Sequence, residues 1–236
     1  MRQIVLDTET TGIGHEHGHR IIEIGCVELI DRRITKNHYH VYLNPQRTID
    51  DGAFKVHGIS NEFLKDKPEF NEIVEEFLAF IDGAELIIHN APFDVGFLNS
   101  ELTHVKWHKR LEDYCNIFDT LVYAREKHPG QRNSLDALCK RYDIDNSNRQ
   151  LHGALLDAEI LAWVYLSLTG GQGTLFSESS SEEMVSQKSE TLNKTVDKID
   201  LPIIKATEIE IENHLSLIEL IVNNSGINYW EDSKTS

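Results

Sequence analysis

Four carboxylates in three short segments of the sequence could bind metal ions. Asp7 and Glu9 lie in LDTETTG, where an apolar run ends, and residues i and i+2 of a β-strand project from the same face. Asp94 ends the segment HNAPFD, and Asp157 ends HGALLD. Taken alone, each is explained as well by a polar strand end or by an acid in the first turn of a helix. Taken together they predict a site for hard divalent cations, because Mg²⁺ and Mn²⁺ prefer oxygen ligands.

Asp157 is the most unusual of these acids, and His152 precedes it by five residues. Asp157 begins an apolar helical stripe that continues through Leu161 and Leu168, and a carboxylate on such a face is costly unless it is compensated. Five residues correspond to about 140° on an ideal helix, so the two side chains would not share a helical face. We therefore expect Gly153 to let His152 lie in the preceding loop and bend back over the site.

The elements that must position these residues follow from the apolar periodicity. Alternating or continuous apolar runs predict strands at residues 2–7, 20–30, 34–43 and 85–89. Spacings of three and four residues predict helices at residues 69–82, 93–102, 134–142 and 153–168. Gly83 is a plausible stop, Pro92 a first-turn residue and Ser134 an N-cap. This mixture of strands and helices predicts an α/β fold.

Size and composition are typical of one globular domain with an appended tail. The chain has 236 residues, of which 40% are hydrophobic, and a net charge of −16. Such acidity is unusual for a nucleic-acid binder, but metal ions can neutralise a carboxylate site and a tether to a partner can replace intrinsic affinity. Three widely spaced cysteines and the lack of a long apolar run predict a soluble cytoplasmic protein without a membrane partner.

The composition changes after residue 171. Residues 1–171 are predicted to form the globular domain, and residues 172–200 a flexible linker rich in Ser, Glu, Lys and Thr. Residues 201–236 regain apolar character but are too few to form a core of their own. We interpret them as a docking segment.

The three acidic segments, in this order, resemble the three motifs of the DEDDh exonuclease family. The resemblance covers residues 2–170 and implies a ribonuclease H-like fold, a mixed β-sheet flanked by helices. The segments RIIEIGCVELI, VHGIS and PGQRNSLDALCKRY are similar to the family members that proofread for bacterial replicative DNA polymerases. The resemblance therefore implies a 3′→5′ DNA exonuclease.

The same resemblance assigns roles to the candidate residues. It implies that Asp7, Glu9 and Asp157 hold one Mg²⁺ ion, and that Asp7 bridges to a second, which Asp94 supports through water. Mn²⁺ is expected to substitute for both ions. His152 would act as general base, since an imidazole titrates near neutral pH. The products would be deoxynucleoside 5′-monophosphates.

The resemblance also implies contacts with the terminal nucleotide of a single-stranded or frayed 3′ end. The expected substrate-binding residues are Thr8, Glu9, Thr11, Gly12, His57 and Asp157, with Ile13 beside them. For His57, a loop histidine without a role is the alternative. Relatives often carry an acid at the position of Gly52, so a carboxylate contact with the terminal sugar is not expected here.

The tail contains a candidate binding motif for a partner protein. Gln172, Leu175 and Phe176 form QxxLF, which resembles the peptide by which bacterial proteins bind the sliding clamp. The alternative is a hydrophobic staple that closes the domain. Residues 201–236 correspond in position to the segment that binds the polymerising subunit. Whether a third small core subunit binds is left open.

Two other functions compete with proofreading as explanations of these motifs. The first is a DEDDh exonuclease acting on RNA, an oligoribonuclease or a tRNA-trimming enzyme, which generally lacks such a linker and docking tail. The second is a non-catalytic polymerase scaffold, which predicts the loss of one of the five site residues, whereas all five are present. The alternating His15, His17 and His19 offer a Zn or Ni site, although an exposed loop explains them as well.

Overall fold

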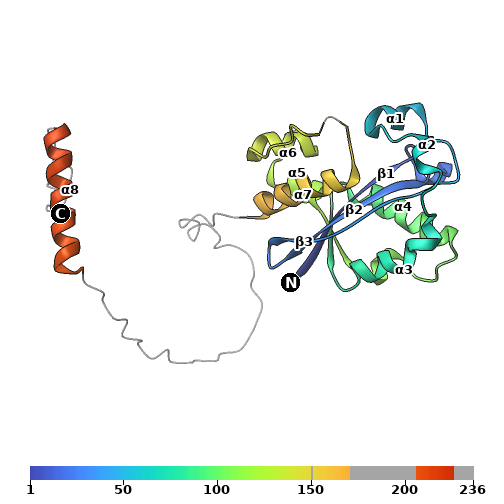
Figure 1. Cartoon of the computed structure of the whole chain (residues 1–236), viewed down its shortest axis with the longest axis horizontal. Coiled ribbons are helices and arrows are strands. Elements are labelled where there is room, and N and C mark those ends of the chain that lie inside the picture. Colours follow the sequence, from blue (N-terminus) through green and yellow to red (C-terminus); the bar gives the residue numbers. More distant parts are fainter. Residues whose placement is uncertain (150, 171–205, 226–236) are drawn as a thin grey trace, which may run out of the picture. The chain divides into compact units, whose positions relative to one another are not determined.

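The computed structural model describes residues 1–149, 151–170 and 206–225 (Figure 1). The chain divides into two units, Met1–Ser181 and Glu182–Ser236, which are considered separately. Residues 171–205 lie outside the description, and with them the predicted linker, the QxxLF peptide and the predicted domain boundaries.

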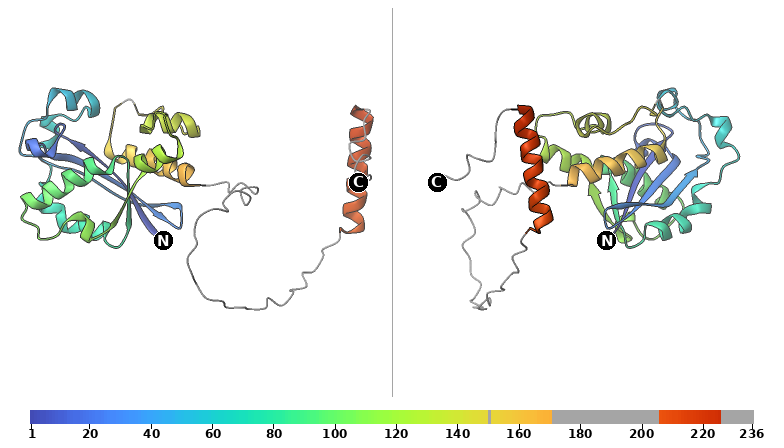
Figure 2. Two further views of the ribbon diagram at one scale, coloured as in Figure 1. Left: turned by 180° about the vertical axis from the view of Figure 1, so that it is seen from behind. Right: turned by 60° about the vertical axis from the view of Figure 1, so that its left-hand side comes forward.

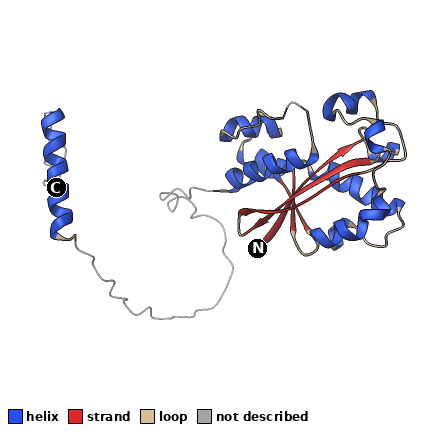
Figure 3. Ribbon diagram, viewed as in Figure 1, coloured by secondary structure: helices blue, strands red, loops and turns tan. Residues whose placement is uncertain are grey.

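The first unit is built on a mixed five-stranded sheet (Figure 3). Its strands are β1 (Arg2–Thr10), β2 (Ile21–Ile30), β3 (Arg33–Tyr42), β4 (Glu85–Ile88) and β5 (Asn116–Asp119). The order across the sheet is β3-β2-β1-β4-β5. The pairs β1/β2 and β2/β3 are antiparallel, whereas β4 runs parallel to both β1 and β5. The ends of β1, β4 and β5 therefore meet at one edge.

Helices cover both faces of this sheet (Figure 1). Ile4 and Leu6 of β1 point into a core with α3 (Phe70–Ile81) and α4 (Ala91–His104). Val5 points to the opposite face, where α7 (Ala154–Thr169) packs through Ala158 and Leu161. The side chains of β1 thus alternate between two buried layers, which explains why the strand is apolar on both faces.

Shorter elements complete the first unit (Figure 2). They are α1 (Asp51–His57), α2 (Asn61–Leu64), α5 (Thr120–Lys127), α6 (Leu135–Tyr142) and the 3₁₀ turns η1 (His15–His17) and η2 (Leu111–Asp113). Helices α5, α6 and α7 share a second core around Ala124, Leu138 and Val164. Helix α1 is tied to the first strand's exit by a hydrogen bond from the Asp50 amide to the Thr11 carbonyl.

Most of the predicted elements are confirmed, but several begin or end at other residues than the sequence predicted. The first strand runs to Thr10 rather than residue 7, so Glu9 belongs to it. Ser134 caps α6, its Oγ accepting from the Ala137 amide, and Gly83 follows α3 with a positive φ of 69°. The elements α1, α2, β5 and α5 are present without having been predicted from the sequence.

The second unit is described only through α8 (Glu208–Ser225). A reciprocal capping box begins it, in which Thr207 and Glu210 satisfy each other's backbone amides. Large apolar side chains such as Ile209, Leu215 and Leu220 are exposed along it. Among the residues with a described position, no helix is both long and apolar enough to cross a membrane.

Candidate active site

The candidate site lies at the edge where the parallel strands end. Glu9 is near the end of β1, and Asp119 ends β5. The residues after β4 turn directly into α4, which begins at Ala91 and carries Asp94 in its first turn. Ligands of α/β sheets commonly bind beyond the carboxyl ends of the strands. Three elements distant in sequence therefore present polar groups at one place.

Asp157 is brought to β1 by close packing of α7. Asp7 pairs with Gly25 of β2, and a Cβ on Gly25 would lie 2.2 Å from the Leu155 backbone nitrogen. Only glycine permits this approach of the helix to the sheet. Asp157 follows in the first turn of α7 and is 3% exposed. The carboxylate on the apolar stripe thus points into the sheet edge, as its sequence position predicted.

Asp94 approaches from the other face of the sheet. The Thr8 hydroxyl donates a hydrogen bond of 2.6 Å to Asp94 Oδ1 in a buried position. Thr8 lies between Asp7 and Glu9 on the strand, so its side chain points toward α4 while theirs point toward α7. Asp94 is 3% exposed. The end of β1 therefore lies between the first turns of α4 and α7, which carry Asp94 and Asp157.

Ligand atoms of Glu9, His152 and Asp157 lie within 4.8 Å of one another. Burial first, and then repulsion from Asp94, Glu9 and Asp157, raises the pKa of Asp7 well above its ordinary value. Burial and the charge of Asp157 raise the pKa of Glu9 to about 8. Burial raises the pKa of Asp94 to about 7, against the hydrogen bond from Thr8. All four predicted carboxylates therefore act on one another.

Arg149 is a residue of this site that the sequence analysis did not predict. Its Nη2 donates to Asp157 Oδ2 at 2.7 Å and to His152 Nδ1 at 3.1 Å, while Nε bonds Asp157 Oδ1. Nη1 binds Asp136 at 2.9 Å, and the side chain is 9% exposed. A signal was present in the sequence, since Arg149 lies three residues before His152 in the segment RQLHGALLD.

His152 lies in the loop before α7, as predicted. Its amide donates to the Val56 carbonyl of α1 at 3.1 Å, which anchors the loop across the site. Gly153 has a φ of −155°, an extended conformation open to any residue, so the expected need for a flexible glycine there is wrong. Burial and the neighbouring guanidinium of Arg149 lower the pKa of His152.

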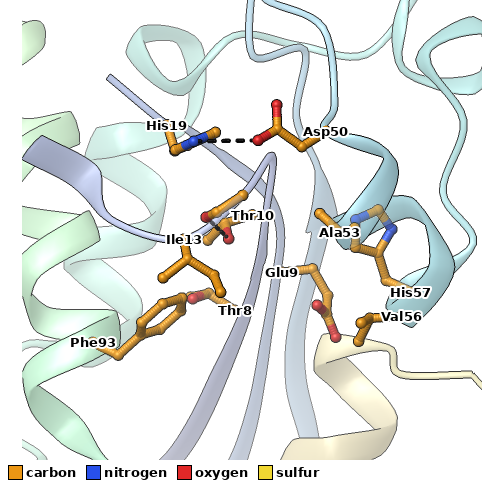
Figure 4. A pocket seen from close by; sticks show the side chains of 12 residues that line it. Thr8, Glu9, Thr10, Ile13, His19, Asp50, Ala53, Val56, His57 and Phe93 are labelled. Carbon is orange, nitrogen blue, oxygen red and sulfur yellow. Dashed lines mark hydrogen bonds and ion pairs between the residues drawn. The ribbon is translucent and has the colours of Figure 1, made fainter. Parts of the chain in front are cut away.

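A cavity of about 390 Å³ opens beside Glu9 (Figure 4). Ile13 and Phe93 form one side of it, and Ala53, Val56 and His57 of α1 form the other. We call this the apolar cavity. Ile13 is 84% exposed and extends the apolar wall to the mouth of the cavity.

The predicted substrate-binding residues line this cavity with two exceptions, Thr11 and Asp157. Thr8, Glu9, Gly12 and His57 face it. Thr11 is fully buried and does not line the cavity, and its hydroxyl is engaged by His19 Nδ1 and the Arg20 amide, so its contact with substrate stays a prediction. Thr11 therefore lies beneath the residues that line the cavity and supports them.

His57 has a position that favours a role over the alternative of an idle loop residue. Its Nδ1 accepts a hydrogen bond from the Ile59 amide, whereas Nε2 is buried without a partner among the described residues. A buried orphan nitrogen at a cavity wall suits a ligand hydroxyl or phosphate. Gly52 also lines the cavity and, as expected, supplies no carboxylate.

The alternating histidines do not form a common metal site. His19 contacts Thr11 and Asp50, whereas the ring of His15 packs edge-on against Phe97. His17 is exposed beside Glu16. Each histidine has different partners, which favours the structural explanation.

The four carboxylates fit divalent cations by their chemistry. Three of them are buried, they supply only hard oxygen atoms, and burial together with repulsion from neighbouring carboxylates raises the pKa values of Asp7 and Glu9. Among the described residues, Arg149 is the one permanently charged cation in ion-pair contact with them. Such a surplus of buried negative charge is stable only with added cations or protons.

A family model described as Exonuclease (RNase T) matches residues 4–165. The DNA polymerase III subunit epsilon of Haemophilus influenzae is 50% identical over 99% of this chain and 95% of its own length. That of Escherichia coli K12 is 49% identical over 97% of each chain. This chain belongs to the DNA polymerase III subunit epsilon family.

Solved structures support the assignment of this epsilon-family chain. Exonuclease X in complex with 5′ overhanging duplex DNA superposes with a TM-score of 0.56 at 26% identity, covering 72% of this chain and 93% of that one. The nuclease domain of 3′hExo, a DEDDh family member bound to rAMP, gives 0.58 at 15% identity over 70% and 90%, a similarity of fold alone. The predicted ribonuclease H-like fold and 3′→5′ exonuclease activity are therefore confirmed.

Proposed function

We propose that this chain proofreads for a bacterial DNA polymerase III holoenzyme by hydrolysing mispaired 3′-terminal nucleotides to deoxynucleoside 5′-monophosphates. The observation that supports it most is the meeting of four carboxylates and His152 beside a cavity of about 390 Å³. Relatives that match nearly the whole chain and are named for DNA polymerase III favour this function over RNA trimming.

The carboxylates are assigned as ligands of two Mg²⁺ ions, for which Mn²⁺ can substitute. Asp7, Glu9 and Asp157 would hold one ion, and Asp7 together with Asp94, the latter through water, would hold the other. Divalent ions in such a site lower the pKa of water and stabilise charge on the attacking and leaving oxygens of an in-line displacement. The assigned ligands are all carboxylate oxygens, which hard ions such as Mg²⁺ and Mn²⁺ prefer.

His152 is assigned as the general base. A lowered pKa keeps its ring neutral near pH 7, as a proton acceptor requires. A guanidinium can only donate, so the contact with Arg149 makes Nδ1 the acceptor and leaves the ring proton on Nε2. Nδ1 would then take the proton of the attacking water in exchange for its bond to Arg149.

The apolar cavity is assigned to the terminal nucleoside. Its walls are side chains such as Ile13, Val56 and Phe93, which can pack against the flat face of any base. His57 Nε2 would supply a polar contact with the nucleotide. Selection of mismatches then needs no base reading, because a mispaired end frays more easily and enters as a single strand.

Hydrolysis of 5′-labelled single-stranded DNA and RNA with Mg²⁺ tests this function. We expect a ladder that shortens from the 3′ end on DNA, and almost no activity after the double substitution His152→Ala, Asp157→Ala. Strong preference for short RNA would favour the RNA-exonuclease alternative. Undiminished cleavage by the double variant would show that another site or a contaminant is responsible.

The segment 201–236 is proposed to dock on the polymerase III alpha subunit. Helix α8 supports this, because Ile209, Leu215 and Leu220 are exposed on a helix that begins with its own capping box. Deleting residues 201–236 should abolish co-purification with the alpha subunit while nuclease activity remains. A truncated chain that still co-purifies would contradict the assignment. A third small core subunit is left undecided.

Gln172, Leu175 and Phe176, outside the described residues, are proposed to bind the sliding clamp. Replacing Leu175 and Phe176 with Ala should weaken binding to the clamp and leave the rate on free DNA unchanged. Thr174→Ala, within the same pentapeptide, is a matched control because the QxxLF pattern leaves its position open. If the Leu175/Phe176 double variant bound the clamp as tightly as Thr174→Ala, the proposal would be contradicted.

A further inference from the structure

Arg149 contacts two of the assigned catalytic groups through a single guanidinium. Its Nε and Nη2 both donate to the carboxylate of Asp157, so each of the two oxygens accepts one bond. The same Nη2 also donates to His152 Nδ1 at 3.1 Å. His152 Nδ1 and Asp157 Oδ2 lie 3.5 Å apart, close enough for one nitrogen to bind both. A movement of the guanidinium would therefore release the carboxylate and the imidazole together.

These contacts compete with the role of Asp157 as a metal ligand. A guanidinium and a divalent ion carry charges of the same sign, and on one buried carboxylate they repel each other because the local dielectric constant is low. The side chains of Asp157 and Arg149 are 3% and 9% exposed, so water screens this repulsion little. Ligand atoms of Glu9 and His152 lie within 4.8 Å of that of Asp157, where an ion would be held. An ion there and Arg149 in its observed position therefore compete for Asp157.

A second position is open to the guanidinium of Arg149. Arg149 and Asp136 of α6 both line a cavity of about 590 Å³. Nη1 already donates to Asp136 Oδ1 at 2.9 Å, and the side-chain amide of Asn146 donates to the same oxygen at 3.1 Å. Asp136 is not one of the four carboxylates, and its side chain is 64% exposed. The guanidinium can thus keep one ionic partner when it leaves Asp157, and the cavity provides the space.

We infer that Arg149 is a positioning residue that a divalent ion displaces, so that ion binding frees Asp157 and uncovers His152 in one movement. The inference rests on the proposed function. Without ions, Arg149 neutralises Asp157 and covers Nδ1, the nitrogen that must accept the proton of water. With an ion at Asp157, the guanidinium turns to Asp136 and Nδ1 becomes free. The general base is therefore available only when the metal site is filled.

The alternative is that Arg149 stays on Asp157 and orients it toward the ion, as partners of metal ligands commonly do. The two roles predict opposite changes in metal affinity when Arg149 is replaced. Removal of a competitor leaves the ion bound more tightly, whereas loss of an orienting bond leaves it bound more weakly. Titration of the full chain with Mn²⁺ in the absence of DNA, with free Mn²⁺ counted by electron paramagnetic resonance, measures the difference.

For Arg149→Gln we expect the first Mn²⁺ to bind about 10-fold more tightly than to the wild-type chain, because one charge-assisted hydrogen bond no longer competes. Arg149→Lys keeps the charge but not the bidentate contact, and should bind with intermediate affinity. Arg125→Gln removes a guanidinium from the same cavity and leaves Arg149 in place. It is the matched control for net charge and should change the affinity by less than about 2-fold.

Asp136→Asn tests the position to which the guanidinium moves. Asp136 is largely exposed, so the variant should fold normally. We expect Mn²⁺ to bind about 3-fold more weakly, because the displaced guanidinium loses its charged partner at the surface. Opposite changes in Arg149→Gln and Asp136→Asn, at the two ends of one ion pair, are not expected from general damage to the fold.

Nitrogen NMR of the histidine side chains at fixed pH reports the uncovering of His152. Mg²⁺ should shift the Nδ1 resonance in the wild-type chain, and the metal-free Arg149→Gln variant should show it shifted already. The resonance is assigned by its absence from His152→Gln.

Weaker or unchanged Mn²⁺ binding by Arg149→Gln would overturn the inference. An equal gain in Arg125→Gln, or a His152 Nδ1 resonance that Mg²⁺ leaves in place, would overturn it as well. A wild-type chain that binds no Mn²⁺ would contradict the proposed function, and the inference with it.

Discussion

The two cavities beside the carboxylate cluster differ in almost every property that recognition can use. The apolar cavity is walled by Ile13, Val56 and Phe93 and is suited to contact a base by packing. The other cavity, of about 590 Å³, is lined by the polar side chains of Arg125, Gln131 and His152, and we call it the polar cavity. Neither cavity presents the array of donors and acceptors that would read a base sequence. The carboxylate cluster therefore lies between an apolar surface that suits a base and a polar surface on the side of the general base.

The largest expected effect comes from a change at the junction that both cavities share. Asp157→Asn keeps the shape of a buried side chain but removes a charged ligand. We expect kcat to fall by about 10³-fold or more on the p-nitrophenyl ester of thymidine 5′-monophosphate and on a single-stranded oligonucleotide alike, since several kcal/mol of transition-state stabilisation depend on the bound ions. Steady-state kinetics on both substrates measure this. A loss confined to one substrate would show that the cavities do not share a centre.

The next effect concerns Arg149, which belongs to the polar cavity and yet contacts Asp157. Without divalent ions, Arg149→Gln leaves a buried carboxylate uncompensated, and we expect the free energy of unfolding to fall by about 2 kcal/mol. Mg²⁺ should restore most of the loss, because cations then replace the guanidinium. Thermal denaturation in EDTA and in Mg²⁺ measures both. Equal destabilisation in the two buffers would show that Arg149 serves only packing.

A third, smaller effect tests the packing of a base in the apolar cavity. Ile13→Ala removes an exposed apolar side chain at the rim of the apolar cavity, and we expect KM to rise about 5-fold on both substrates, from roughly 1 kcal/mol of lost apolar contact. The salt dependence should not change. Ile30→Ala, at an exposed isoleucine far along β2, is the matched control. A changed salt slope in Ile13→Ala would contradict the division between the cavities.

The smallest effect is a pH dependence of stability in the metal-free protein. The folded pKa values of Asp94, about 7, and Glu9, about 8, lie above those of the unfolded chain. Raised pKa values stabilise the fold at low pH, and this stability is lost as the pH rises from about 4, where the unfolded carboxyl groups ionise, through the folded pKa values. In EDTA we expect the melting temperature to fall between about pH 4 and pH 8, by about 2–4 °C for each kcal/mol lost. Mg²⁺ should lessen the fall, and a melting temperature that rises with pH in EDTA would contradict the assignment.

The sequence predicted the parts of the site that local pattern determines. Asp7 and Glu9 were predicted to share a face because a strand has a period of two, and Asp157 because a charge interrupts an apolar helical stripe. Tertiary contacts decided what was missed. Thr11 is turned into the wall by His19 and Arg20, which lie in the segment just before β2.

The short elements were missed for a related reason. The strand Asn116–Asp119 has four residues, too few for a periodic signal, and is defined by its pairing with β4. Asp119 gains its importance only because that pairing places its carboxylate beside Asn90 and Ala91. Likewise, Arg149 looks like a loop cation until the loop folds back over α7.

One measurement tests the central claim most directly, namely a crystal of the chain grown with Mn²⁺ and thymidine 5′-monophosphate and recorded at the manganese absorption edge. We predict two anomalous peaks about 3.5–4 Å apart among Asp7, Glu9, Asp94 and Asp157, with the nucleoside in the apolar cavity and its phosphate at the metals. Manganese bound away from these carboxylates, or a nucleoside in the polar cavity, would contradict the account.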